Sequence, residues 1–263
     1  MKSRVLTAIG LIPFVLGTFL LASPWPLLLM ALATAGISAL ELEKLLNFPA
    51  RYSTLFVTVV AGMAPFAFTG IPVLLLAIGC LFLAVAGVVG GYIRAKDRTS
   101  QVGALLAPLW FVSPLICLLI LHGQLQPNSG SFSLNPILMA VAPLWGGDSA
   151  AYFVGKAFGK RLLAPSISPK KTVEGAIANV AACLAVALPL GHYLGYSPTI
   201  SALCGLSAGV FGQMGDLYES YLKRQANLKD SGTLLPGHGG ILDRIDSILF
   251  TAPIVFFIIA TKL

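Results

Sequence analysis

The chain has 263 residues, of which 57% are hydrophobic and only 10% are charged, and its mean hydropathy is +0.87. A soluble domain carries roughly 25% charged residues, so this composition excludes an ordinary soluble protein and indicates an integral membrane protein. The formal net charge of +7 does not predict nucleic-acid binding, because the basic residues lie in short segments between apolar runs. The cysteines lie within apolar runs without close pair spacing, which favours small buried hydrophobes over disulfides or a metal site. They are Cys80, Cys117, Cys183 and Cys204.

Nine apolar runs that are long enough to cross a bilayer follow one another along the chain. A transmembrane helix needs roughly 17–25 residues, and each run can supply that length with some tilt. The first run is long for the core of a signal peptide, so we expect it to remain in the mature protein. The sequence therefore predicts an all-α, polytopic integral membrane protein with about nine transmembrane helices. The runs cover residues 5–22, 25–43, 54–70, 71–93, 102–121, 135–155, 173–194, 198–218 and 245–261.

The distribution of basic residues sets the expected orientation. Of the 17 Lys and Arg residues, all but Lys262 precede the first run or follow the second, fourth, sixth and eighth runs. The positive-inside rule makes that side cytosolic. We therefore expect a cytosolic N-terminus and a multi-pass protein of the inner (cell) membrane whose active site faces the cytosol.

The two long cytosolic loops are expected at residues 156–172 and 219–244, and soluble chemistry can take place there. Both belong to residues 135–263, which we interpret as the catalytic region, whereas residues 1–134 supply the first five helices. We expect the two regions to form one structural unit.

Several carboxylates lie in or beside the C-terminal apolar runs, where a charge needs a reason. Asp148 lies inside the sixth run, Asp216 lies near the cytosolic end of the eighth, and Asp243 and Asp246 share one face of the ninth if it is helical. Buried carboxylates at a common depth require cations beside them, and oxygen ligands suit Mg²⁺. We therefore expect Asp216 and Asp243 to hold a cation. The alternative, a structural ion pair with a neighbouring base, is preferred for Glu41, Glu43 and Asp97.

Basic side chains are interleaved with these acids. Lys170 and Lys171 precede the start of the seventh run, and a helix N-terminus with two lysines makes an anion-binding cradle. Topology signals or lipid-headgroup contacts are the alternative, which we prefer for the bases of the N-terminal half. For the bases beside the acids, the pattern favours phosphate binding. The further ones are Lys223, Arg224, Lys229 and Arg244.

A glycine-rich turn, Pro236-Gly237-His238-Gly239-Gly240, lies between the eighth and ninth runs. Glycine allows the backbone to approach a ligand closely, as in phosphate-binding loops, although an isolated glycine cluster is weak support for such a site. His238 is open to three roles, as a general base, a hydrogen-bond donor or a plain loop residue.

The spaced pattern of Ser220, Lys223-Arg224, Lys229-Asp230, Pro236-Gly-His238-Gly-Gly240 and Asp243-Arg244-Ile-Asp246 resembles the signature of bacterial phosphatidate cytidylyltransferases (CDP-diacylglycerol synthases). The segments around Asp148 and from Ser168 to Gly175 resemble two upstream motifs of that family. Ser149 and Val173 stand where Thr and often Trp are expected. The resemblance covers the C-terminal half in detail and the first five runs in general character.

The resemblance implies an enzyme that transfers a cytidylyl group from CTP to phosphatidate, giving CDP-diacylglycerol and pyrophosphate. It implies Mg²⁺ at Asp216 and Asp243, where a monovalent cation such as K⁺ can also bind, and a homodimer in the bilayer. The expected catalytic residues are Asp148, Lys223, Arg224 and Asp246. The expected substrate-binding residues are Ser168, Lys170, Lys171, Thr172, Glu174, Ser220, Lys229, Asp230, His238 and Arg244.

Two other functions share parts of this pattern. A CTP-dependent lipid alcohol kinase of the dolichol or phytol kinase type would use a similar site but transfer the γ-phosphoryl group. A transporter of an anionic solute would need polar groups through both halves of the membrane, whereas the ionisable groups here cluster on one side. The complete signature favours the cytidylyltransferase.

Overall fold

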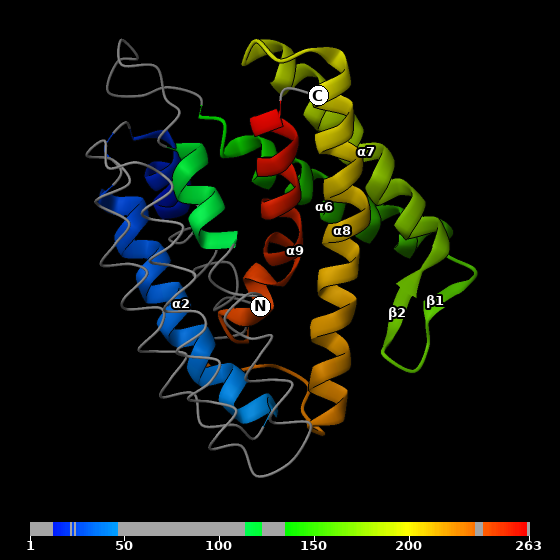
Figure 1. Cartoon of the computed structure of the whole chain (residues 1–263). Helices are drawn as coiled ribbons and strands as arrows, with labels where there is room; N and C mark the ends of the chain where they lie inside the picture. The colour runs from blue at the N-terminus through cyan, green and yellow to red at the C-terminus, as the bar shows by residue number, and fades with distance from the viewer. Residues whose placement is uncertain are drawn as a thin grey trace. The chain divides into compact units, whose positions relative to one another are not determined.

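The structure, a computed structural model, describes residues 13–21, 23, 25–46, 114–122, 135–234 and 239–261 (Figure 1). Residues 13–20 and 114–122 are helical. The third and fourth expected spans, 54–70 and 71–93, lie outside the described residues. The remaining elements are α2 (Trp25–Leu46), α6 (Leu138–Phe158), β1 (Leu162–Ala164), β2 (Ser168–Thr172), α7 (Val173–Tyr193), α8 (Pro198–Gln225) and α9 (Leu242–Thr261).

Within the described part of the chain, three helices are long and apolar enough to cross a membrane: α2, α7 and α9. The expectation of a mainly helical membrane protein is confirmed at this level. The apolar runs predicted α7 within one residue at its C-terminal end, and α9 begins three residues earlier than its run. The reason is that Asp243 and Arg244 occupy the first turn of α9, so hydropathy alone places the helix start too late.

The chain divides into two compact units. The first comprises Met1–Ser133 and Gln225–Arg244, and the second comprises Leu134–Arg224 and Ile245–Leu263. The segment after α8, which we expected to belong with the C-terminal region, thus groups with the N-terminal half. Each unit is described by itself below.

In the second unit, α8 packs against its neighbours through glycines. At Gly209, an added Cβ would lie 2.8 Å from the Cα of Val180 on α7, and at Gly212 it would overlap the side chain of Leu144 on α6. At Gly215 it would overlap the backbone carbonyl oxygen of Asp246 on α9. Small residues of this kind let helices approach closely in membranes. The approach of α9 at Gly215 lies directly beside Asp216, the next residue of α8.

The described residues depart from the all-α prediction in one place, a two-stranded antiparallel hairpin. Strand β1 pairs with β2 from Leu162 opposite Thr172 to Ala164 opposite Ser168, with a change of register between the two pairs. Thr172 then caps α7, because its Oγ1 accepts the backbone N–H of Gly175 at 3.2 Å. The predicted loop 156–172 is thus a short helix end followed by this hairpin, which projects beyond the start of α7 in Figure 1.

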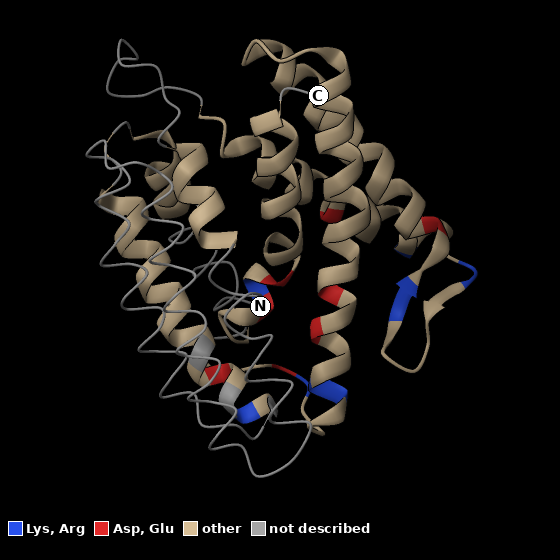
Figure 2. Ribbon diagram, in the orientation of Figure 1, with Lys and Arg blue, Asp and Glu red and all other residues tan. Residues whose placement is uncertain are grey.

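Helix α8 is longer than its apolar run predicted. It continues to Gln225, so that Ser220, Lys223 and Arg224 lie on its last turns and not in a loop. Glu219 and Lys223 form an ion pair one turn apart, which supports a helix beyond the apolar residues. Asn227, at φ 55°, adopts the left-handed conformation that is common just after a helix end. Figure 2 shows the charged residues of α8 confined to its C-terminal part.

Candidate active site

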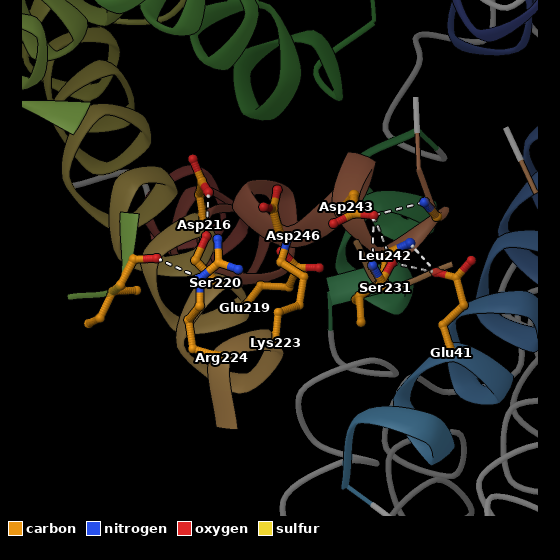
Figure 3. A network of polar contacts seen from close by, with 12 residues as sticks. Glu41, Asp216, Glu219, Ser220, Lys223, Arg224, Ser231, Leu242, Asp243 and Asp246 are labelled. Carbon is orange, nitrogen blue, oxygen red and sulfur yellow. Dashed lines mark hydrogen bonds and ion pairs between the residues drawn. The ribbon is translucent and has the colours of Figure 1, made fainter. Parts of the chain in front are cut away.

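An ion pair between Lys171 and Asp216 joins the hairpin to α8 within the second unit. Lys171 comes from the end of β2 and Asp216 from α8, and their side chains are 27% and 34% exposed. Ser220, one turn further along α8, directs its Oγ toward Oδ1 of Asp216 at 3.5 Å (Figure 3). The hairpin therefore brings Lys171, a predicted substrate-binding residue, into contact with Asp216, a predicted metal ligand.

A second carboxylate, that of Asp246, faces the same group of charges. Asp246 lies on α9, is only 8% exposed, and interacts electrostatically with Asp216, Lys223 and Lys171. Its Oδ1 accepts the backbone N–H of Ser247. Because two carboxylates repel each other at short range, the surrounding lysines are what keeps them together. Four predicted site residues are thus brought together within one unit.

Glu219 and Lys223 form a buried pair of which the sequence predicted only one member. Lys223 was predicted as a catalytic cation, but Glu219 was not singled out, although its side chain is fully buried next to that lysine. A buried carboxylate needs a cation beside it. Lys223 therefore serves Glu219 as well as Asp246. The signal that could have identified Glu219 was its position one turn before Lys223 on a helix that continues past its apolar run.

Asp148 is held on the exposed side of α6 by two amides that sequence reasoning missed. Asn179 of α7 donates from Nδ2 to Oδ1 of Asp148 at 3.2 Å. Gln213 of α8 donates from Nε2 to Oδ1 of Asn179 at 3.4 Å and to the carbonyl of Ala176 at 3.2 Å. Asn179 is 3% exposed. Buried amides within otherwise apolar spans were the available signal, because polar residues there are rare without a function.

The β hairpin is fixed to the first turn of α7 by Glu174. Its Oε2 accepts the backbone N–H groups of Lys160 at 3.1 Å and Arg161 at 3.2 Å, and its Oε1 pairs with the guanidinium of Arg161. On the other side, Arg224 donates from Nε to the carbonyl of Ile167 in the hairpin turn at 3.2 Å. Glu174 and Arg224, both predicted to act on substrate, are therefore seen supporting the hairpin that carries Lys170 and Lys171.

In the first unit, Asp243 folds the segment before α9 onto itself. Its Oδ2 accepts the backbone N–H of Ser231 at 3.0 Å and the N–H of Gly240 at 2.8 Å, and it lies 3.0 Å from the hydroxyl oxygen of Ser231. Lys229, Asp230 and Arg244 are exposed. Residues 235–238, which include His238, lie outside the described part of the chain. The predicted ligand Asp243 is thus also the residue that closes this loop.

Glu41 of α2 forms hydrogen bonds with the same loop. This finding corrects our expectation that it pairs with a neighbouring base. It accepts hydrogen bonds from the hydroxyl of Ser231 and from the backbone N–H groups of Ile241 and Leu242. The side chain of Glu43 and the residue Asp97 lie outside what the structure describes. Glu41 could not be identified from the sequence, because its partners lie about 200 residues away.

The carboxylates near Lys171 can hold a metal ion only together with other ligands. Among the described residues, no group of three or more His, Cys, Asp or Glu side chains is arranged to hold a metal ion by itself. The pair of Asp216 and Asp246 supplies carboxylate oxygens of the type that Mg²⁺ takes, and Mg²⁺ commonly uses only one or two protein carboxylates, with substrate phosphates completing its shell. The residues present therefore fit a cation that is shared with a phosphate.

Cys183 and Cys204 are buried free thiols, as expected. Cys80 lies outside the described residues.

The sequence profile of the cytidylyltransferase family matches residues 2–262. The chain belongs to this family. The phosphatidate cytidylyltransferase of Pseudomonas aeruginosa is 35% identical to this family member over 268 residues, which cover 97% of this chain and 95% of that protein. The family that the Ser220–Asp246 signature predicted is thereby confirmed.

Two further relatives of this cytidylyltransferase-family chain match over shorter stretches. The phosphatidate cytidylyltransferase of Bacillus subtilis is 49% identical over 135 residues, and that of Synechocystis is 47% identical over 140 residues. In these two matches the chain spans about half the length of the relative, 50% and 47% respectively.

Proposed function

We propose that the protein transfers the cytidylyl group of CTP to phosphatidate, producing CDP-diacylglycerol and pyrophosphate. The observation that carries the proposal is the match to a protein named phosphatidate cytidylyltransferase along nearly the whole chain. The charged group formed by Lys171, Asp216, Lys223 and Asp246 supports it, because it combines cations for phosphates with carboxylates for a metal.

In the proposed reaction, a phosphate oxygen of phosphatidate attacks the α-phosphorus of CTP. A new phosphorus–oxygen bond forms, and the bond between the α-phosphorus and the bridging oxygen breaks, so that pyrophosphate leaves. The attacking oxygen is already ionised near neutral pH, so no strong general base is needed. The main barrier is the repulsion between two polyanions. Lys170, Lys171, Lys223, Arg224 and Arg244 are proposed to offset it by binding the phosphates and fixing their geometry.

A magnesium ion is proposed as the cofactor. Asp216 and Asp243 are its predicted ligands, Asp148 and Asp246 are further ligands or supports, and a monovalent cation such as K⁺ is a candidate second ion. When bound, the metal neutralises phosphate charge and stabilises the charge that develops on the leaving pyrophosphate. The ion pair between Lys171 and Asp216 supports this arrangement, because it places a carboxylate that can bind a cation next to a lysine that can bind a phosphate.

The setting of the reaction is proposed as well. We propose about nine transmembrane helices with a cytosolic N-terminus in the cell membrane, which follows from the charge distribution between apolar runs. The acyl chains of the substrate then stay in the bilayer while its phosphate meets CTP at the cytosolic surface. A homodimer is proposed from the family resemblance.

The position of a radioactive label in CTP tests the proposal. Purified protein in lipid nanodiscs is incubated with Mg²⁺, phosphatidate and CTP that carries the label on either the α or the γ phosphorus. We expect α label, and no γ label, in the lipid product. Label from the γ position in lipid, with a diacylglycerol or polyprenol acceptor, would instead show a lipid kinase. Absence of both labels from lipid would leave no support for group transfer and would favour transport.

A further inference from the structure

Glu41 is a buried carboxylate that joins two segments far from it in the sequence. Its side chain lies near the C-terminal end of α2, and the residue is 5% exposed. Oε1 accepts the N–H of Ile241 at 3.0 Å, and Oε2 accepts the N–H of Leu242 at 2.8 Å and the hydroxyl of Ser231 at 2.9 Å. All these residues belong to the first unit. One side chain thus ties both ends of the loop 231–242 to α2.

The two amides that Glu41 binds are those at the start of α9. The first N–H groups of a helix have no partner within the helix and carry partial positive charge, so an anion stabilises them. Capping residues normally come from the same segment of chain. Here the capping carboxylate comes from a different helix, so it ties Ile241 and Leu242 to α2 as well as satisfying their N–H groups.

Ser231 couples Glu41 to Asp243. The Ser231 hydroxyl lies 2.9 Å from Oε2 of Glu41 and 3.0 Å from Oδ2 of Asp243, and it has only one proton to donate. The backbone N–H groups of Ser231 and Gly240 also donate hydrogen bonds to Asp243 (Figure 3). A change in the position of Glu41 therefore acts on Asp243 through a single intervening residue.

The loop is closely fitted around these two carboxylates. A Cβ added to Gly232 or to Gly240 would overlap the carboxylate of Glu41. At Gly239, which has φ +84°, an added Cβ would lie 2.6 Å from Oδ2 of Asp243. The glycines of the signature thus make room for Glu41 and Asp243, which is a reason for their presence besides contact with a phosphate.

We infer that Glu41 is a positioning residue for the proposed cytidylyl transfer. It acts through Ser231 and the backbone N–H groups of Ile241 and Leu242, and it sets the place of Asp243 by anchoring both ends of the loop 231–242 to α2. Burying a carboxylate is costly unless hydrogen-bond donors replace the water that it loses. Three donors from the loop replace that water here. A buried glutamate in an apolar helix, where an apolar residue would suffice, therefore points to a role for its hydrogen bonds. The inference rests on the proposed function for its kinetic consequence but not for its structural one.

The test measures loop anchoring separately from turnover. Full-length Glu41→Gln and wild-type protein are compared in nanodiscs by hydrogen–deuterium exchange of peptides that cover residues 231–242. Amides that are bonded to a buried acceptor exchange only when the structure opens. We expect exchange at Ile241 and Leu242 to speed up at least tenfold, because a glutamine side chain offers one acceptor oxygen where the carboxylate offers two. We expect kcat for cytidylyl transfer to fall at least tenfold with KM for CTP changed less than threefold.

Ser38→Ala is the matched control. Ser38 is buried on α2 one turn before Glu41, and its hydroxyl has no hydrogen-bond partner among the described residues. It should leave both the exchange of the loop and kcat unchanged.

Unchanged exchange in Glu41→Gln overturns the anchoring, and faster exchange with unchanged kcat overturns the positioning role. If wild-type protein shows no transfer, the proposed function fails, while the exchange data still decide whether Glu41 anchors the loop. If Glu41→Gln fails to fold, Ser231→Ala replaces it as the variant. It should speed exchange from Gly240 to Leu242 and lower kcat at least threefold, and wild-type values for both would overturn the inference.

Discussion

Replacing Gly215 by alanine should separate α8 from α9 at the charged group. An added Cβ would overlap the carbonyl oxygen of Asp246 and lie 3.1 Å from the side chain of Phe250. Carbon atoms pack at about 3.5–4.0 Å, so α9 would have to shift by a distance on the order of 1 Å. The atom that obstructs the Cβ belongs to the backbone and cannot rotate away, so the helix itself must move.

The expected magnitude follows from this overlap. Overpacking of this kind destabilises by about 1–3 kcal/mol, which corresponds to a melting temperature lower by about 2–12 °C at 2–4 °C per kcal/mol. A 1 Å displacement of site residues can also lower turnover by about 100-fold. Asp216 follows Gly215 directly and Asp246 is the residue displaced, so we expect a loss of activity larger than the loss of stability would produce.

Gly36→Ala is the control for this prediction. Gly36 lies inside α2, and apart from its own helix backbone and chain neighbours a Cβ added there meets no atom of the described residues within 4 Å. Alanine is favoured over glycine within a helix by about 0.5–1 kcal/mol, so this variant should melt at the wild-type temperature or above it. Both variants are measured by thermal unfolding in detergent and by cytidylyl transfer. Equal melting temperatures and rates for the two variants would refute the close approach of α8 and α9 at Gly215.

Three further outcomes are expected. Asp216→Asn should lower turnover by about 100-fold without loss of protein from the membrane, because it removes a predicted metal ligand and the ion pair with Lys171; near-normal turnover would contradict the metal assignment. Asn179→Ala should lower the free energy of unfolding by about 1–3 kcal/mol, since it removes buried hydrogen bonds to Asp148 and Gln213, and a wild-type melting temperature would count against this network. Glu174→Gln should speed tryptic cleavage after Arg161, because the hairpin loses its charged acceptor; an unchanged cleavage rate would show that the hairpin is held by other contacts.

Hydropathy predicted the ends of α7 and α9 closely because these helices are apolar along nearly their whole length. It failed at the C-terminal end of α8, where the helix continues through charged residues that pair with one another. The hairpin was missed because its strands are three and five residues long and lack an alternating pattern. Local sequence carries too little information about such short elements.

The candidate site was predictable to the extent that its residues are charged side chains in or beside the apolar runs. Lys171, Asp216, Lys223 and Asp246 were all singled out, and the structure places them together in the second unit. Glu41 could not be recognised, because its three partners are 190–201 residues away and two of them are backbone N–H groups. Asn179 was overlooked because a single amide in an apolar run gives no sign of which residue it bonds. The types of the side chains predicted which charges lie together, whereas hydrogen bonds to backbone groups could be found only from the fold.

The length of α8 has a consequence for how substrate reaches the enzyme. Its 28 residues extend about 42 Å at 1.5 Å per residue, which exceeds a hydrocarbon core of about 30 Å. Asp216, the nineteenth residue of the helix, lies about 27 Å from its start. In the membrane setting that we propose, α8 crosses the bilayer, which puts Asp216 close to the edge of the hydrocarbon core and Ser220 to Arg224 beyond that edge. A phospholipid can then arrive by diffusion within the plane of its leaflet, and the encounter rate depends on the mole fraction of that lipid in the membrane, not on its concentration in the cytosol.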